Sequence, residues 1–443
     1  MVPETGFAPV SAERAASPAA APLALRSRAE AEAYVASVCF KHGPPRLVGV
    51  EIEWVLRAGG PPDLGDLLAA LGPHAPTSLV PASPAAPLPG GSLVTVEPGG
   101  QVELASPPLA ELRTLTATVE ADAAHLHRLL AARGLTPEPR AAEPCRPALR
   151  LVQLPRYRAM ERAFDRHGAF GRSGMTSTSA VQVALDAGEP DQVSSRWAAL
   201  HELGPVLLAA FANSPALHGR STGWRSSRFA AWLAADHART VPPTPAELDR
   251  ADPAQTWAER VVGTPLLCVR GPGEWTTPVG VTFADWIGGA LPGTPTTEDL
   301  EYHISTLFPP VRPRGFLEVR YVDGQQGGDW ALPVAVLAAL TARPETVDRV
   351  RELCAPVRAR WLVACRLGLA DPELARAARA VFALACEALA ALDPPPALAE
   401  RLAAVTEGRI AAGRSPADDP LPGEPTVVDP IEIVPTSTEG VLP

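Results

Sequence analysis

The segment VEPGGQVELAS, residues 96–106, places two glutamates on either side of a Pro-Gly-Gly turn, inside stretches that otherwise predict buried β-strands. A hairpin loop with an odd number of residues, 98–100, puts Glu97 and Glu103 on the same face of the hairpin, whereas a two-residue loop would separate them. We predict the odd loop. The chain would then carry two carboxylates side by side on one face of a β-sheet.

Three further predicted strands divide their side chains in the same way, because successive side chains point to opposite faces of a sheet. The apolar face comprises Val50, Ile52 and Trp54 in residues 46–57, Val181, Val183 and Leu185 in residues 176–186, and Leu317, Val319 and Tyr321 in residues 315–323. The opposite face comprises Glu51 and Glu53 in residues 46–57, Thr178, Gln182 and Asp186 in residues 176–186, and Phe316, Glu318, Arg320 and Val322 in residues 315–323. This pattern predicts an α+β fold in which an antiparallel sheet packs one face on helices and lines the other with carboxylates.

Five carboxylates on one sheet face repel one another unless cations neutralise them. The ligand set is all oxygen, which suits Mg²⁺ or Mn²⁺ better than zinc. Metal ligation is therefore the predicted purpose of the glutamates, and Arg320 beside Glu318 could neutralise a transferring phosphoryl group. Two plainer interpretations stay open. Alternating acids also mark the solvated face of an ordinary sheet, and Arg320 can simply form a salt bridge with Glu318.

Composition excludes several classes of function. The net charge is −10 and Lys41 is the single lysine among 39 basic residues, so we expect neither a nucleic-acid nor a membrane partner. No basic and apolar leader and no apolar stretch of about 18 to 20 residues is found, so we expect a cytoplasmic protein. The six cysteines form no CxxC pair, which favours reduced thiols over a zinc site or a disulfide framework.

The chain is expected to form one catalytic domain over residues 27–412, mostly helical from 331 to 412. Residues 1–26 and the acidic, Pro-rich residues 413–443 are predicted to be disordered. Apolar periodicity predicts the other helices over 27–40, about 109–134, after Pro155, over about 192–213, near Arg225, near Pro253 and over 296–308.

Eight segments, in chain order, resemble the glutamate-cysteine ligase family of the plant and proteobacterial type. They are GVEIEW, TVEPGGQVELASPP, RYRAM, MTSTSAVQVALD, AFANSPALHG, GWRSSRFAAW, TFADWIGG and ISTLFPPVRPRGFLEVRYVDGQ. The resemblance covers roughly residues 30–345. The Arg- and Ala-rich composition is most similar to actinobacterial members of the family, which feed ergothioneine synthesis.

The resemblance implies a fold like the catalytic domain of glutamine synthetase, in which a curved antiparallel sheet forms a funnel. It implies an ATP-dependent ligase that makes gamma-glutamylcysteine from L-glutamate and L-cysteine through a gamma-glutamyl phosphate. Mg²⁺ or Mn²⁺ would be the cofactor and ATP a co-substrate.

The resemblance also implies roles for individual residues. The metal ligands would be Glu51, Glu53, Glu97, Glu103, Gln182 and Glu318. Arg320, together with Glu318, would act on the transferred phosphoryl group, and Arg314 would bind ATP. Substrate would contact Arg228, Tyr157, Arg158, Met175, Thr176, Ser177 and Thr178.

Two other functions stay open at this point. The chain can be a carboxylate-amine ligase of the same fold that uses another amine, because the sequence places the metal site far better than the cysteine pocket. It can also be a non-catalytic sensor that binds nucleotide or glutamate.

Overall fold

A six-stranded antiparallel sheet forms the centre of the molecule. The computed structural model describes residues 22–57 and 63–421. The strand order is β3-β4-β1-β6-β10-β9, and every neighbouring pair is antiparallel. The strands are β1 Val48–Trp54, β3 Leu93–Val96, β4 Val102–Ala105, β6 Ala180–Leu185, β9 Val311–Pro313 and β10 Leu317–Asp323. Two small pairs lie outside it, β2 Leu56–Arg57 with β5 Thr136–Pro137 and β7 Ala216–Leu217 with β8 Arg220–Ser221.

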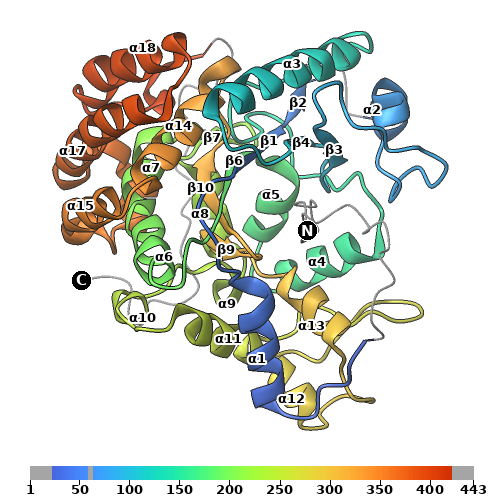
Figure 1. Cartoon of the computed structure of the whole chain (residues 1–443). Helices are drawn as coiled ribbons and strands as arrows, with labels where there is room; N and C mark the ends of the chain where they lie inside the picture. Colours follow the sequence, from blue (N-terminus) through green and yellow to red (C-terminus); the bar gives the residue numbers. More distant parts are fainter. Residues whose placement is uncertain (1–21, 58–62, 422–443) are drawn as a thin grey trace, which may run out of the picture.

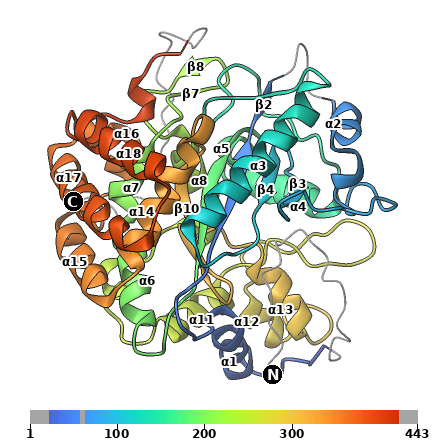
Figure 2. The ribbon, with the colours of Figure 1, turned by 45° about the horizontal axis from the view of Figure 1, so that its top comes forward.

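Helices cover the apolar face of the sheet. Helix α3 (Leu112–Ala131) contacts β1, α14 (Ala331–Thr341) contacts β6, and α7 (Gly204–Phe211) contacts β10. Every residue of α14 is buried, as expected for a helix between the sheet and an outer helical layer. Figure 2 shows α3 crossing this side of the sheet with α14 and α7 beside it.

The remaining helices form an outer layer and enclose the polar face. The C-terminal helices pack on α6, α7 and α14 at the left of Figure 1. They are α15 Pro344–Cys354, α16 Trp361–Leu367, α17 Pro372–Leu389 and α18 Pro396–Val405. The others are α1 Arg28–Cys39, α2 Leu64–Leu71, α4 Pro155–Asp165, α5 Phe170–Ser177, α6 Val193–Glu202, α8 Ser227–Ala235, α9 His237–Thr240, α10 Pro245–Leu248, α11 Pro253–Gly263, α12 Phe283–Ile287 and α13 Thr297–Ile304.

The α+β class and the antiparallel sheet are confirmed, and so are most predicted helices. The predicted helix over 192–213 is wrong as one element, because it is divided into α6 and α7 at Leu203. Gly204 and Pro205 open α7, and a proline lacks the backbone N–H that a continuous helix needs there. Residues 176 and 177 belong to α5 and not to the predicted strand, which starts at Ala180.

The hairpin between β3 and β4 has the predicted odd loop. Val96 pairs with Val102 and Thr95 with Glu103, and the amide of Glu97 donates to the carbonyl of Gln101 at 2.8 Å. Glu97 and Glu103 therefore lie on one face, as predicted. Thr95 confirms this, because its hydroxyl donates to the Glu103 carboxylate at 2.7 Å.

Strand β10 departs from strict alternation. Its register against β6 passes from Val319 opposite Val183 to Val322 opposite Val181, so β10 holds one extra residue between these pairs. The prediction that Val322 shares a face with Glu318 is therefore wrong, because the bulge returns Val322 to the apolar side with Val181. Tyr321 stays buried, and its hydroxyl donates to the carbonyl of Leu200 at 3.0 Å.

The predicted disordered ends are shorter than expected. Leu25 is buried and its amide donates to the carbonyl of Pro295. At the other end Ser415 is fully buried, and Arg140 donates to the carbonyl of Pro416 at 2.8 Å. The prediction of disorder thus fails for residues 22–26 and 413–421, and its remaining parts lie outside the described residues.

Candidate active site

A cavity of about 560 Å³ lies on the polar face of the sheet. Strands β1, β4, β6 and β10 supply its floor, and helices α4, α5, α8 and α13 enclose it. Both faces of the sheet therefore carry helices, and the cavity lies between the strands and the helices of the polar face, of which α8 also contacts β10. The side chains at its floor divide into an acidic and a basic half.

The acidic half consists of Glu51 and Glu53 from β1, Glu103 from β4 and Glu97 from the adjoining turn, all of which line the cavity. Glu53 directly opposes Glu103 in the register. Its carboxylate accepts from the amide of Ala180 at 2.8 Å and from the side chain of Gln182 at 2.7 Å. These partners are neutral donors, so they orient the carboxylates without compensating their charge.

The acidic half resists ionisation. Burial, its largest cause, and the charge of Glu53 together raise the pKa of Glu97 to about 7. Burial followed by the charges of Glu51, Glu97 and Glu53 raises the pKa of Glu103 well above its usual range. The pKa values of Glu51 and Glu53 are also raised, chiefly by burial. Nearby arginines oppose these shifts at Glu51, Glu53 and Glu97 without reversing them, so the acidic half favours protonated carboxyl groups unless a cation takes the place of the protons.

The basic half consists of Arg312, Arg314 and Arg320, which line the cavity, and Glu318, which they surround. The Glu318 carboxylate lies 2.7 Å from Arg312, 3.2 Å from Arg314 and 3.0 Å from Arg320. Burial opposes its ionisation, but the charges of Arg312, Arg320 and Arg314 outweigh burial and lower the pKa of Glu318. The predicted salt bridge between Arg320 and Glu318 is thus present, and two more arginines share it.

Gln182 joins the two halves. Its amide nitrogen donates to Glu53 and its carbonyl oxygen accepts from Arg320. Glu51 faces Gln182 across the β1–β6 ladder. The predicted polar face of three strands is therefore one continuous surface, with Gln182 at its middle.

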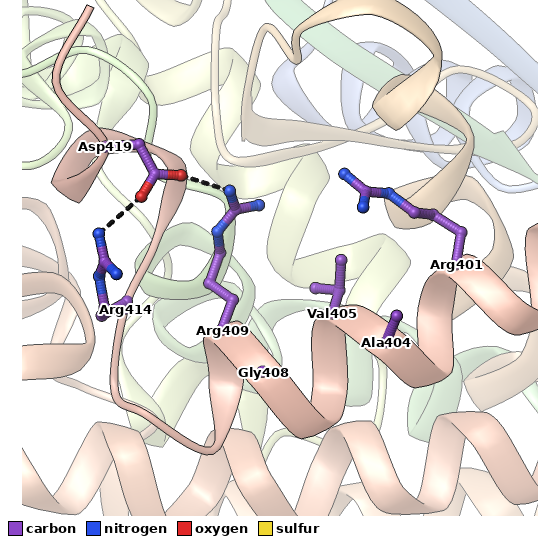
Figure 3. A pocket seen from close by; sticks show the side chains of 7 residues that line it. All are labelled: Arg401, Ala404, Val405, Gly408, Arg409, Arg414 and Asp419. Carbon is purple, nitrogen blue, oxygen red and sulfur yellow. Dashed lines mark hydrogen bonds and ion pairs between the residues drawn. The ribbon is translucent and has the colours of Figure 1, made fainter.

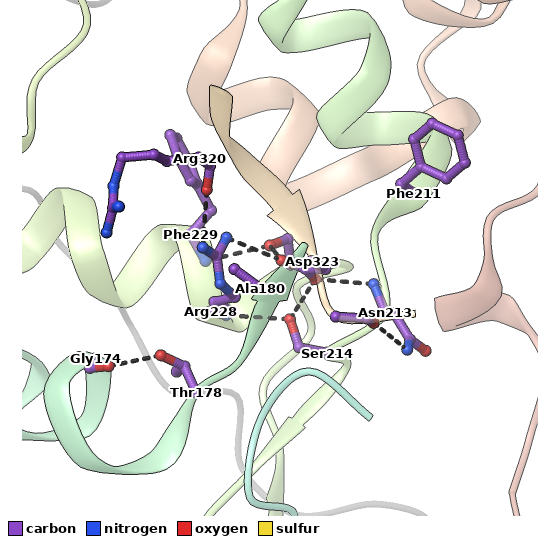
Figure 4. A network of polar contacts seen from close by, with 12 residues as sticks. Gly174, Thr178, Ala180, Phe211, Asn213, Ser214, Arg228, Phe229, Arg320 and Asp323 are labelled. Atoms are coloured by element: carbon purple, nitrogen blue, oxygen red, sulfur yellow. Dashed lines mark hydrogen bonds and ion pairs between the residues drawn. The ribbon is translucent and has the colours of Figure 1, made fainter. Parts of the chain in front are cut away.

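Arg228, on α8, lines the cavity beside the basic half and is almost fully buried. Its Nη2 donates to the carbonyl oxygen of Arg320 at 2.8 Å, and its Nη1 lies 3.6 Å from Asp323. Burial lowers the pKa of Arg228, while the charges of Asp323 and Glu53 oppose that shift. Figure 4 shows the guanidinium held between Arg320 and Asp323.

The hairpin turn explains part of the predicted substrate segment. Gly100 has a φ of +85°, and a Cβ at Gly99 would lie 1.9 Å from the carbonyl oxygen of Thr176, so only glycines fit this turn. The turn therefore packs directly on the end of α5. Met175 and Thr178 reach the cavity from that segment, whereas Thr176 and Ser177 are buried but do not line it.

Helix α4 presents a different arginine from the one predicted. Arg156 and Tyr157 line the cavity, whereas Arg158 is exposed and lies outside it. The guanidinium of Arg156 stacks 5.2 Å from the ring centroid of Tyr302, and Arg270 stacks at 4.9 Å on the same ring. The helical period, applied to RYRAM, separates the faces of Arg156 and Arg158, but it does not show which one faces inward.

A divalent cation suits the acidic half by its donor set, which offers carboxylate and amide oxygens. Within residues 22–57 and 63–421, no three His, Cys, Asp or Glu side chains already lie close enough to enclose a metal ion. The neutral donors on Glu53 and Glu103 are groups that a cation can replace. The donor types present therefore fit Mg²⁺ or Mn²⁺.

A smaller cavity of about 230 Å³ lies beside α18, far in sequence from the sheet (Figure 3). Its arginines are paired with carboxylates, although two of them share one. Arg409 and Arg414 pair with Asp419, and Arg401 pairs with Asp329 at 3.0 Å. No glutamate of the described residues lines this cavity, so it has no acidic half like that of the cavity on the sheet.

The cavity thus places an acidic half and a basic half side by side on one face of an antiparallel sheet. The family model described as "Glutamate-cysteine ligase family 2(GCS2)" matches residues 47–422. This chain therefore belongs to glutamate-cysteine ligase family 2, which confirms the predicted membership.

Several relatives support that assignment. The chain is 38% identical to a glutamate–cysteine ligase, EgtA, of Mycolicibacterium smegmatis, over 92% of this chain and 94% of the relative. It is 37% identical to EgtA of Mycobacterium tuberculosis (strain CDC 1551 / Oshkosh), over 89% of each. The chloroplastic glutamate–cysteine ligase of Medicago truncatula is 30% identical over 54% of this chain and 48% of its own length.

Among solved structures, the chain is similar to the glutamate–cysteine ligase of Francisella tularensis in complex with AMP. The TM-score is 0.49 and the identity 12%, and the match covers 85% of this chain and 84% of that one. In the described part of the chain, no helix is long and apolar enough to cross a membrane.

Proposed function

We propose that this chain is an ATP-dependent ligase that joins L-glutamate to L-cysteine and forms gamma-glutamylcysteine, ADP and phosphate. The observation that carries the proposal is the division of one cavity into an acidic half suited to divalent cations and a basic half suited to phosphoryl groups. The names of the relatives, which are glutamate–cysteine ligases at up to 38% identity, support the same reaction.

The reaction needs such a division because a carboxylate is a poor acyl donor. An oxygen of the glutamate gamma-carboxylate attacks the terminal phosphorus of ATP, and the bond from that phosphorus to the bridging oxygen of ADP breaks. The cysteine nitrogen then attacks the acyl carbon, the carbon–oxygen bond to phosphate breaks, and the amine loses a proton. Phosphate leaves in place of oxide.

The residues divide this work between them. Glu51, Glu53, Glu97, Glu103 and Gln182 would hold Mg²⁺ or Mn²⁺, with Glu318 as a further ligand where the arginines release it. The cation, when bound, would neutralise charge on the nucleotide phosphates.

The basic half would act on the phosphoryl group. Arg320 would stabilise its negative charge during transfer, and Arg314 would contact ATP with Arg312 beside it. Arg228 would bind the amino-acid substrate near Tyr157, Met175 and Thr178, which line the same cavity. Arg158, Thr176 and Ser177 have no part in this proposal, because they do not line it.

The pathway that we expect for the reaction is inferred from the actinobacterial members of the family that the sequence resembles. The product would feed ergothioneine synthesis in the cytoplasm. Deletion of the gene should then lower cellular ergothioneine, and unchanged ergothioneine would separate the reaction from that pathway.

The test is release of ADP by the purified protein with MgATP and glutamate, with and without cysteine and a panel of other amines. We expect cysteine-dependent ADP release, with gamma-glutamylcysteine detected by mass spectrometry. ADP release only with another amine would assign the chain to a different carboxylate-amine ligase. Binding of nucleotide or glutamate without turnover would favour a sensor.

A further inference from the structure

Asp323, the last residue of β10, is a fully buried carboxylate that does not line the cavity. Its Oδ2 accepts from the backbone amide of Asn213 at 2.9 Å and from the hydroxyl of Ser214 at 2.7 Å. Its Oδ1 accepts from the hydroxyl of Ser226 at 2.8 Å. Three fixed donors thus hold the carboxylate in one orientation, as Figure 4 shows for Asn213 and Ser214.

The one charged partner of this carboxylate in the described ranges is the guanidinium of Arg228, 3.6 Å away. Ser214 fixes the other end of that residue, because its hydroxyl accepts from the Arg228 amide at 3.1 Å. The carbonyl of Arg320 accepts from Nη2. The position and the plane of the guanidinium are therefore set by Asp323, Ser214 and the carbonyl of Arg320.

The bulge in β10 makes this arrangement possible. The extra residue lies between Val319 and Val322, and it is there that the carbonyl of Arg320 points to Arg228. The same shift places Asp323 opposite Ala180, whose amide donates to Glu53. The bulged strand β10 therefore supplies both contacts of the guanidinium, the carbonyl of Arg320 and the carboxylate of Asp323.

One nitrogen of Arg228 remains available for a ligand. Its Nε is buried and has no hydrogen-bond partner among the residues that the structure describes, whereas Nη1 makes the ion pair with Asp323. The side chain nevertheless lines the cavity. A buried donor without a partner costs free energy unless a ligand satisfies it, and the Nε–H of a guanidinium can donate a charge-assisted hydrogen bond to a carboxylate.

We propose that Asp323 is a positioning residue, which holds the guanidinium of Arg228 in the orientation that binds a carboxylate of the amino-acid substrate. The identity of that substrate as glutamate rests on the proposed function. Asp323 itself touches no substrate. Asn213, Ser214 and Ser226 support this role indirectly. They donate hydrogen bonds to the Asp323 carboxylate, which in turn orients the Arg228 guanidinium.

The first test is steady-state kinetics of Asp323→Asn, which keeps the shape of the side chain and removes its charge. We expect the KM for glutamate to rise about 10-fold or more, while kcat changes less than about 3-fold, because substrate binding is lost more than transition-state stabilisation. The KM for ATP should stay within about 2-fold. An unchanged KM for glutamate would overturn the proposal.

Asp122→Asn is the matched control. Asp122 is also fully buried and accepts from the amides of Gly90 and Ser92, but it lies on α3, which packs on the opposite face of the sheet. We expect it to lower thermal stability without changing the KM for glutamate. An equal rise in that KM for both variants would show a general effect of buried aspartates and would contradict a positioning role.

A second measurement does not depend on turnover. Phenylglyoxal modifies accessible arginines, and peptide mass spectrometry reports its rate at each position. We expect Asp323→Asn to accelerate modification of Arg228 several-fold and to leave unchanged Arg239, a buried arginine paired with Asp236. Equal rates at Arg228 in both proteins would overturn the proposal. If the wild type lacks ligase activity, the proposed function fails, and this measurement still decides the role of Asp323.

Ser214→Ala covers the possibility that Asp323→Asn does not fold. It removes one donor to Asp323 and the acceptor for the Arg228 amide, but it keeps the charge pair. We expect the KM for glutamate to rise about 2- to 5-fold, with faster modification of Arg228. Wild-type values for both quantities would contradict the proposed network.

Discussion

Glu103 in the acidic half and Glu318 in the basic half are both buried glutamates on the same face of the same sheet, and their pKa values shift in opposite directions. Burial raises the pKa of both. The charges of Glu51, Glu97 and Glu53 add to that effect at Glu103, whereas three arginines reverse it at Glu318. The comparison shows that neighbouring charge, and not burial, decides what each half can bind.

The two halves accordingly need ligands of opposite charge. The carboxyl groups of the acidic half accept hydrogen bonds from neutral donors and have raised pKa values, so a cation in place of their protons would complete this half. In the basic half three arginines share one carboxylate, so a phosphoryl group would complete it. A reaction that brings MgATP to a carboxylate substrate needs both conditions in one cavity.

Glu318→Gln should have the largest effect on this balance. The variant leaves three arginines without their shared carboxylate, so we expect ADP formation to be abolished. We also expect the free energy of unfolding to fall by about 3 to 5 kcal/mol, because a buried charge network has lost one partner. ADP release and urea denaturation measure the two effects, and circular dichroism checks the fold. Wild-type turnover would remove Glu318 from the site.

Arg320→Lys should have the next largest effect. Lysine keeps the positive charge but loses the planar guanidinium, whose Nη1 donates to both Gln182 and Glu318. We expect kcat to fall about 100-fold or more, with smaller changes in the KM values. Steady-state kinetics of both proteins give the comparison. Unchanged kcat would mean that Arg320 acts only as a salt-bridge partner.

Glu97→Gln should change how stability depends on pH in protein without divalent cations. The pKa of Glu97 is about 7 in the folded chain, above its usual 4.5, so the folded state binds the proton more tightly than the unfolded state. Its contribution to stability is present below pH 4.5 and is lost as the pH rises toward 7.

The stability of wild type relative to Glu97→Gln should therefore fall by about 1 to 3 kcal/mol between pH 4.5 and pH 7. Urea denaturation of both proteins at several pH values measures this difference. A constant difference across the range would contradict uncompensated charge at Glu97.

Glu103→Gln should give the smallest effect. With EDTA present, removal of one of four repelling charges should stabilise the chain by about 1 kcal/mol, while Thr95 keeps its hydrogen-bond acceptor. With Mg²⁺ present, the wild type should gain more stability than the variant. Thermal unfolding under the two conditions measures the change. Destabilisation in EDTA would mean that Glu103 is structurally compensated.

The acidic half could be predicted from the sequence because it depends on local rules. Alternation along β1 and the odd loop between β3 and β4 place four glutamates on one face, and the structure agrees. The general position of Arg320 followed from the same alternation. The helices were predicted for a similar reason, since apolar periodicity and capping residues are local signals.

The contacts behind Arg228 could not be predicted in this way. They join α8, the turn at Asn213 and the end of β10. They also depend on a bulge in β10 that the sequence of this strand does not indicate. The orientation of RYRAM also depends on packing, which turns Arg156 inward and Arg158 outward. Residues 176 and 177 have strand-like chemistry, yet the close contact with Gly99 holds them in α5.

Binding of Mn²⁺, followed by the loss of its free electron paramagnetic resonance signal, decides whether the acidic half is a cation site. Wild type and Glu53→Gln would be titrated with Mn²⁺, with and without ATP and glutamate. We expect the wild type to remove Mn²⁺ from solution in at least the ATP-bound state, and Glu53→Gln to bind it at least about 10-fold more weakly. Equal binding by both proteins, or none by the wild type in either state, would contradict the assignment of the acidic half as a cation site.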